Sequence, residues 1–226
     1  SGVLTEHAQM YDNMTGTQNL IFYASLFDIP SREARSRTES LLKRLGLENA
    51  GAKKLSAYST GMRQRLSLAR ALIHQPRVLF LDEPTSGLDP ESAQNVNQLI
   101  RDLAYQEGIT VFLCTHQLRY AQEICTRYGL IEDGTLLAAG TLEELRRDVL
   151  SDTILQVHVE KMPVGLPFRK SGENQYEMDI RSDTEIPHLV RQIVEGGGEV
   201  YDVTAQKPSL EDIYFALTAK GKGEAM

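Results

Sequence analysis

The chain has 226 residues, of which 41% are hydrophobic and 24% are charged. This length and composition allow a hydrophobic core, which excludes an intrinsically disordered chain and a small fold held together only by disulfides. The 24 basic and 31 acidic side chains give a net charge of −7, which argues against a generally basic surface for nucleic acid.

Targeting and redox features indicate a soluble protein of the cytoplasm. No apolar run approaches the roughly twenty residues of a membrane-spanning helix, and no signal peptide is recognisable. Cys114 and Cys125 lie in apolar or helical contexts without metal-ligand spacing, so we expect buried thiols in a reducing compartment.

Helical spacing predominates between residues 15 and 75. Thr15 and Gln18 form a capping-box pattern at the start of a predicted helix. A second predicted helix begins at Pro30-Ser31 and ends at Gly46, and its dense charges indicate a solvated face.

The middle of the chain alternates short apolar runs with a helix. Residues 78–81 and 110–114 are continuous apolar runs, typical of parallel strands that are buried on both faces. A predicted helix over 90–106 connects them, and this βαβ order predicts an α/β fold. A hairpin is expected over residues 128–139, turned at Asp133-Gly134.

A second unit is predicted after about residue 150. Leu155, Val157 and Val159 alternate with polar residues as in a strand, and Ser209 with Asp212 caps a final helix. We expect a small α+β domain without evident chemistry of its own.

The strongest chemical signal is a pair of adjacent carboxylates, Asp82 and Glu83, directly after an apolar strand. Ligand sites in open α/β sheets lie at the carboxyl ends of strands. Asp82 can hold Mg²⁺ directly or through water, and Glu83 can polarise a water for in-line attack on a phosphate. The alternative interpretation is a strand end that exposes two solvated acids.

Three further positions have both a structural and a functional interpretation. Ser59 is a good N-cap for a helix whose free N–H groups can hold a phosphate. His116 follows the second strand and can contact a phosphate oxygen or position water, although a structural role also accounts for it. Asp89 precedes Pro90 and caps the next helix, which explains it without catalysis.

These motifs occur in a characteristic order along the chain: the helix start at Ser59, the strand-end pair Asp82-Glu83, the cap Asp89 and the strand-end His116. With this order, residues 1 to about 145 resemble the nucleotide-binding subunit of an ABC transporter. The resemblance implies a P-loop NTPase-like α/β fold (the ABC ATPase) with a parallel sheet, and ATP and Mg²⁺ as cofactors. It implies an ATPase domain at 1–150, with a helical subdomain at about 12–75 and a Walker B to switch region at 76–140. The small α+β domain then occupies 151–226.

The resemblance also assigns roles to the motif residues. These are Asp82 for Mg²⁺, Glu83 as the catalytic carboxylate, His116 as the switch histidine, Asp89 in the D-loop, Glu6 in the Q-loop, and Ser59, Thr60, Gly61 and Met62 as the signature that contacts ATP in trans. The implied partners are transmembrane permease subunits and a second nucleotide-binding subunit in a head-to-tail dimer, with no nucleic acid. The implied location is cytoplasmic and peripheral, at the inner face of the cell membrane through the permease.

Three features depart from the family pattern. Glu6 stands where glutamine is usual, and the signature has Tyr-Ser-Thr-Gly-Met in place of Leu-Ser-Gly-Gly-Gln. This variant and the segment 208–214 are similar to bacterial exporters of the drug- or sodium-efflux type. No G-x-x-x-x-G-K-[ST] sequence occurs in the 226 residues. Together with the abrupt start at Ser1, this leads us to expect an N-terminally truncated cassette that is an inactive fragment of an ATPase.

Two other interpretations stay open. A natural half-cassette or regulatory binding module would supply only the signature face to a partner's ATP. A non-transport relative, in chromosome maintenance or ribosome work, ranks lower because no heptad run separates Glu6 from Ser59 and only one set of motifs is present.

Overall fold

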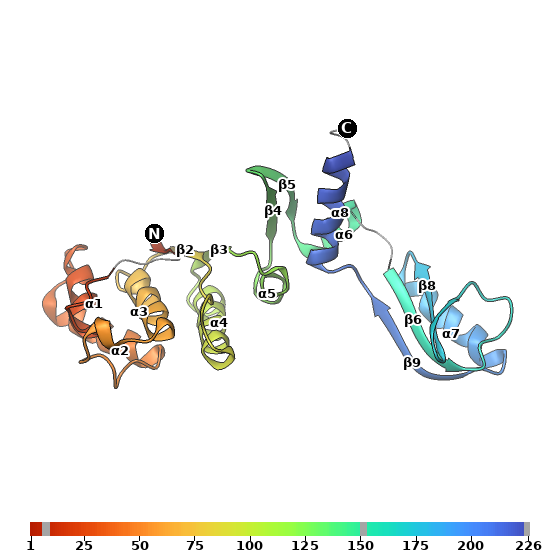
Figure 1. Cartoon of the computed structure of the whole chain (residues 1–226), viewed down its shortest axis with the longest axis horizontal. Coiled ribbons are helices and arrows are strands. Elements are labelled where there is room, and N and C mark those ends of the chain that lie inside the picture. The colour runs from red at the N-terminus through yellow and green to blue at the C-terminus, as the bar shows by residue number, and fades with distance from the viewer. Residues whose placement is uncertain (6–9, 150–152, 224–226) are drawn as a thin grey trace. The chain divides into compact units, whose positions relative to one another are not determined.

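The computed structural model describes residues 1–5, 10–149 and 153–223 (Figure 1). Contacts within the chain divide it into unit 1, Ser1–Gln117, and unit 2, Leu118–Met226. The domain boundary predicted near residue 150 is a different division and stays a prediction. Glu6, expected in the Q-loop, lies outside the described residues.

Unit 1 combines four α-helices with a three-stranded sheet within the part of the chain that the structure describes. Its elements are β1 (Gly2–Leu4), α1 (Gly16–Ser25), α2 (Ser31–Arg44), the 3₁₀ turn η1 (Leu55–Ala57), α3 (Thr60–Leu72), β2 (Val78–Asp82), α4 (Pro90–Tyr105) and β3 (Thr110–Cys114). The strand order is β1-β2-β3 and both pairs are parallel. The α4 helix connects β2 to β3, which confirms the predicted βαβ unit.

The helix starts and stops follow the local sequence. Thr15 caps α1 through a complete capping box with Gln18, as predicted. The α2 helix begins after Pro30, and Gly46 follows its end with φ of 61°, a left-handed conformation that favours glycine. The predicted start of the first helix and both predicted ends of the second are therefore confirmed.

The sheet of unit 1 has one covered and one open face. Side chains alternate between the faces along a strand, and α3 and α4 lie on the same side of the strands (Figure 1). Leu4, Leu79 and Leu81 are buried on the covered face. The prediction that these strands are buried on both faces is wrong, because the neighbouring rings of Phe80 and Phe112 are 42% and 57% exposed within the described chain.

The cysteines also differ from expectation. Cys114 is exposed at the end of β3, and Cys125 is only partly buried. The apolar run suggested a buried thiol, but Cys114 falls on the alternate position that faces away from the helices. Burial raises the pKa of the Cys125 thiol above its usual value.

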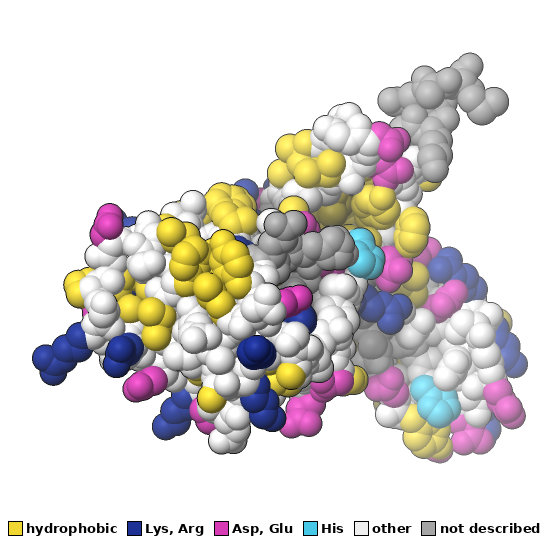
Figure 2. All heavy atoms as spheres, turned by 60° about the vertical axis from the view of Figure 1, so that its left-hand side comes forward, with side chains coloured by type: hydrophobic (Ala, Val, Ile, Leu, Met, Phe, Trp, Pro, Cys, Tyr) yellow, Lys and Arg dark blue, Asp and Glu magenta, His cyan; other side chains and the backbone are white. Residues whose placement is uncertain are grey.

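Exposed apolar side chains are frequent in unit 1. Tyr11, Leu26 and Phe27 are each about half exposed or more. Figure 2 shows hydrophobic side chains gathered in patches between polar ones on the face in view. None of the described helices is long and apolar enough to cross a bilayer.

Unit 2 holds two small cores. Its elements are α5 (Leu118–Ile124), β4 (Tyr128–Glu132), β5 (Thr135–Gly140), α6 (Leu142–Val149), β6 (Thr153–Glu160), β7 (Arg169–Gly172), β8 (Gln175–Ile180), η2 (Asp183–Glu185), α7 (Ile186–Glu195), β9 (Glu199–Gln206) and α8 (Leu210–Gly223). Strands β4 and β5 form the predicted hairpin, with positive φ at Asp133 and Gly134 as a two-residue turn requires.

The first core of unit 2 lies between an antiparallel sheet, in the order β7-β8-β6-β9, and α7. Leu155, Val157 and Val159 are buried on one face of β6, which confirms the predicted alternation. The helix α7 contributes Leu189 and Ile193 to this core and is followed by Gly196. This core therefore combines antiparallel strands with one helix, and the small α+β domain over 151–226 stays a prediction.

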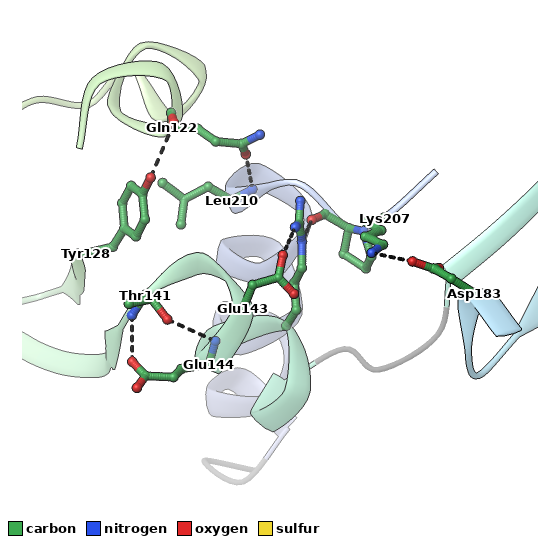
Figure 3. Close-up of polar contacts among 10 residues, drawn as sticks. Gln122, Tyr128, Thr141, Glu143, Glu144, Asp183, Lys207 and Leu210 are labelled. Atoms are coloured by element: carbon green, nitrogen blue, oxygen red, sulfur yellow. Dashed lines mark hydrogen bonds and ion pairs between the residues drawn. The ribbon is translucent and has the colours of Figure 1, made fainter. Parts of the chain in front are cut away.

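The second core of unit 2 joins α5, the hairpin, α6 and α8 around Leu130, Leu145, Leu210 and Ile213. Hydrogen bonds at the helix starts accompany this apolar core (Figure 3). The side chain of Gln122 accepts a hydrogen bond from the N–H of Leu210 at 2.7 Å, which ties the start of α8 to α5. Thr141 and Glu144 exchange hydrogen bonds at the start of α6.

Candidate functional site

Glu83 lies where the chain leaves β2. Its φ is 45°, an uncommon value for a residue with a side chain, and its N–H donates to the carbonyl of Cys114 at 3.0 Å. The chain therefore turns sharply while it stays attached to β3. This geometry places the Glu83 carboxylate at the carboxyl end of the parallel sheet, where α/β proteins hold their ligands.

Both carboxylate oxygens of Glu83 accept hydrogen bonds. Oε1 accepts from the main-chain N–H of His116 at 2.7 Å and lies 2.8 Å from Nδ1 of its ring. Oε2 accepts from the hydroxyl of Thr115 at 3.0 Å. The Glu83 side chain is 14% exposed and that of His116 is 82% exposed, so an anchored carboxylate carries an imidazole that faces solvent.

Thr115 is a site residue that the sequence interpretation missed. It stands between Cys114 and His116, and its hydroxyl also accepts from the N–H of Gln117 at 3.1 Å. The signal was a hydroxyl directly beside the candidate histidine at a strand end. Its contact with Glu83 became visible only when the register of β2 and β3 was known.

Asp82 has no hydrogen bond to this cluster among the residues that the structure describes. It is the last residue of β2, opposite Cys114 in the register, and it is exposed. No group of three or more acidic, histidine or cysteine side chains within the described chain can by itself hold a metal ion. Mg²⁺ commonly binds one or two carboxylates and completes its shell with phosphate oxygens and water. The exposed Asp82 carboxylate fits that kind of site.

The helix α3 begins at the signature residues. The hydroxyl of Ser59 caps the helix by accepting from the N–H of Met62 at 3.2 Å. The carbonyl of Ser59 accepts from the N–H of Arg63 at 2.9 Å. Within the described chain this leaves the N–H groups of Thr60 and Gly61 without partners, which is the arrangement that favours an anion at a helix start.

The start of α3 packs against the turn after β2. A Cβ on Gly61 would lie 3.3 Å from the Leu88 side chain, and one on Gly87 would lie 3.3 Å from that of Thr60. The amide of Gln64 lies 3.3 Å from the carbonyl oxygens of Glu83 and Pro84. The signature helix is therefore coupled to the segment that carries Glu83.

Asp89 caps α4, as the sequence predicted. Its side chain accepts from the N–H of Ser92 at 2.9 Å. The hydrogen bonds from Ser92 lower the pKa of the Asp89 carboxyl. Within the described chain, the structure joins Glu83 directly to His116, while Ser59, Asp82 and Asp89 occupy separate positions around the same turn.

Comparisons with known proteins show the family to which the chain is similar. A sequence model of the family described as ABC transporter matches residues 1–86. Daunorubicin resistance ATP-binding protein DrrA3 of Streptomyces coeruleorubidus is 35% identical over 96% of this chain and 72% of its own length. Bacitracin transport ATP-binding protein BcrA of Bacillus licheniformis is 31% identical over 97% of this chain and 73% of its own length.

A solved structure shares the fold. It is a dimeric ATP-binding cassette in a post-hydrolysis state with ADP and Pi, and it has a TM-score of 0.57 and 26% identity. The match covers 62% of this chain and 62% of that one. The predicted P-loop NTPase-like fold is confirmed by this likeness. The chain belongs to the family of ABC transporter ATP-binding subunits.

Proposed function

We propose that this protein is the ATP-hydrolysing motor subunit of an exporter and that Glu83 is its catalytic carboxylate. The observation that carries the proposal is the cluster of Glu83, Thr115 and His116 at the carboxyl end of the sheet. Relatives of this chain are named for daunorubicin resistance and bacitracin transport, which supports an exporter.

Glu83 has capacity to bind the attacking water. A carboxylate offers about four acceptor positions. The observed contacts use two on Oε1 and one on Oε2. The remaining position on Oε2 can accept a hydrogen bond from a water molecule. This bond would orient a lone pair of the water oxygen toward a phosphorus atom. The water's proton then passes to this oxygen as the new O–P bond forms and the bond to the leaving phosphate breaks.

The contact with Glu83 fixes the tautomer of His116. An ionised carboxylate accepts hydrogen bonds and donates none, so Nδ1 of His116 carries the proton in this contact. Nε2 of the exposed ring is therefore an acceptor in the neutral imidazole and a donor only in the imidazolium. A direct hydrogen bond to a phosphate oxygen requires the protonated ring, whereas the neutral ring can position a water.

Asp82 would hold Mg²⁺ together with phosphate oxygens and water. The ion would neutralise phosphate charge when it is bound. The N–H groups of Thr60 and Gly61 would contact an ATP held mainly by a second subunit. Ser59 and Met62 would define that surface, and Glu6 and Asp89 would complete the family's contact loops.

The phosphate-binding loop is the missing part of this site. No G-x-x-x-x-G-K-[ST] sequence occurs in the 226 residues. We therefore propose that this chain by itself neither binds ATP tightly nor hydrolyses it. A half-cassette that supplies only its signature face to a partner's ATP is the second candidate. It is favoured by the N–H groups of Thr60 and Gly61, which have no partner among the described residues.

Transmembrane permease subunits and a second ATP-binding subunit are the proposed partners. Through the permease the protein would act at the inner face of the cell membrane. The relative named for bacitracin transport supports such a membrane partnership.

ATP turnover by the 226-residue chain and by the complete reading frame tests both parts of the proposal. We expect none from the chain alone, turnover from a complete protein that contains a phosphate loop, and loss of that turnover in Glu83→Gln with ATP binding kept. Turnover by the chain alone that Glu83→Gln abolishes would contradict the proposed inactivity. Full turnover by the complete Glu83→Gln protein would contradict the role of Glu83.

A further inference from the structure

Unit 1 contains a cavity of about 460 Å³ that the proposed ATPase chemistry does not use. It lies between α2, the end of α3 and the turn that connects α4 to β3. The buried side chains of Leu41, Leu72, Ile73 and Leu103 give it an apolar floor. Small-molecule sites have volumes of roughly 300–1,000 Å³ and combine such an apolar lining with a few polar groups.

The charged lining of the cavity is predominantly basic. Arg37, Arg44 and Arg77 line it, and Glu107 is the acid among its lining residues. The chain as a whole carries a net charge of −7. A basic cavity in an acidic protein attracts anions selectively, because the local potential differs from that of the surrounding surface.

The three arginines differ in how many hydrogen bonds and ion pairs their guanidinium groups make within the described chain. Arg37 donates to the carbonyl of Ile73 at 3.0 Å and pairs with Glu33, which lies outside the lining. Arg44 pairs with Glu107 at 2.7 Å, and both side chains are partly exposed. Such surface pairs contribute little stability, so a bound anion can share Arg44.

Arg77 is the arginine of this lining that has no ion pair with any residue that the structure describes. Its side chain is exposed, and within the described chain it has no ion pair or side-chain hydrogen bond. Its carbonyl accepts from the N–H of Thr110 at 3.0 Å, so its main chain is held in place independently of the side chain. The guanidinium is therefore available for a bidentate contact with an oxyanion.

Two hydroxyl groups add neutral donors. Ser36 and Ser40 line the cavity one helical turn apart on the same face of α2. Both side chains are exposed. Serine hydroxyls and arginines together can satisfy the several acceptor oxygens of a phosphate group.

We propose that this cavity binds a phosphate monoester with a short apolar chain. The dianionic head matches the excess of arginine over glutamate in the lining, since a phosphate monoester carries a charge of about −1.5 to −2 at neutral pH. The apolar chain matches the floor of Leu41, Leu72 and Leu103. The site is independent of the ATP site, so it can be tested without ATPase activity.

A neighbouring cavity provides a matched control. It has a volume of about 450 Å³ and is lined by Lys43, Arg65 and Asp102 among others. Arg44 lines both cavities, whereas Arg77 lines only the first and Lys43 only the second. Arg77→Gln and Lys43→Gln each remove one charge and therefore distinguish the two cavities.

Calorimetric titration of the 226-residue chain with hexyl phosphate tests the proposal. We expect saturable binding at one site, weakened about tenfold by Arg77→Gln, the equivalent of ~1.4 kcal/mol, and unchanged in Lys43→Gln. Inorganic phosphate lacks the apolar chain and 1-hexanol lacks the charge, so each should bind at least about tenfold more weakly. Amide chemical shifts of the unsubstituted chain should move at residues 36–41 and 107–109.

Several results would overturn the proposal. They are an absence of saturable binding, equal binding of inorganic phosphate, and a greater loss in Lys43→Gln than in Arg77→Gln. Chemical-shift changes confined to residues 95–98 would place the ligand in the second cavity and would equally overturn it. The shift measurement needs no substitution, so the test stands even if a variant folds poorly.

Discussion

His116 contacts one oxygen of Glu83 twice, through its main-chain N–H at 2.7 Å and through Nδ1 of its ring at 2.8 Å. The main-chain contact does not depend on the ring. Removal of the imidazole therefore leaves Glu83 anchored by the N–H of residue 116 and by the hydroxyl of Thr115. The function of the ring can thus be separated from the anchoring of the carboxylate.

His116→Ala in the complete protein should lower ATP turnover and leave more residual activity than Glu83→Gln. His116→Ala keeps the carboxylate that orients the water. Glu83→Gln removes this general base, and such groups contribute about 10²–10⁴-fold to the rate. Steady-state kcat and equilibrium ATP binding are the measurements. Weakened ATP binding in His116→Ala would contradict a role limited to the hydrolytic step.

Thr115→Val in the complete protein should lower the kcat of ATP hydrolysis with little effect on the KM for ATP. Valine keeps the branched shape and removes the hydroxyl that donates to Oε2 of Glu83 at 3.0 Å. A hydrogen bond to a charged group contributes about 1.5–3 kcal/mol, so a loss of tenfold or more is expected. Thr115→Ser restores the donor and serves as the control; a serine variant as impaired as the valine variant would argue against positioning.

Ser59 tests helix capping and nucleotide contact separately. Ser59→Ala removes the acceptor for the N–H of Met62 and should destabilise the chain by about 1 kcal/mol in urea unfolding. Ser59→Asp retains a capping oxygen and should preserve stability. Its charge should nevertheless repel a nucleotide phosphate, so the complete Ser59→Asp protein should lose ATPase activity. Full activity in that variant would exclude a phosphate near residue 59.

Leu155 should be critical for the first core of unit 2. It is fully buried in β6 among Val157 and Ile193. Leu155→Ala should reduce the free energy of unfolding by about 2–5 kcal/mol. The exposed Val194 offers a control, because Val194→Ala should change it by no more than about 0.5 kcal/mol. Hydrogen exchange of the β6 amides measures both effects.

The start of α8 should be sensitive to acid. The N–H and the hydroxyl of Ser209 donate to Asp212 at 2.8 and 2.6 Å, and these bonds lower the pKa of its carboxyl. The stability that they contribute is fully present above the unfolded carboxyl pKa of about 3.9 and is lost as pH falls through the lower folded value.

Ser209→Ala should therefore be less stable than the unsubstituted chain at pH 6, and the difference should shrink below about pH 4. Urea unfolding as a function of pH measures this difference. A difference that stays constant down to pH 2 would show that the ionised form of Asp212 does not contribute.

Local signals accounted for the elements that were predicted well. Thr15 and Asp89 were identified as caps because an N-cap acts on N–H groups only two or three residues away. The helix predicted over 90–106 corresponds to α4, because helical periodicity is also a local signal. The predicted burial of Phe80 was wrong, because the identity of a residue in a strand does not reveal whether the second face is covered.

The sequence by itself determined the helices, the strands, the caps and the order of the motifs, because each depends on residues close together in the chain. Only the tertiary structure decided that Glu83 turns toward Thr115 and His116 while Asp82 stays exposed. It alone brought Arg77 to the same cavity as Arg37. These contacts depend on strand register and helix packing, which join residues that are distant in sequence and which local propensity does not specify.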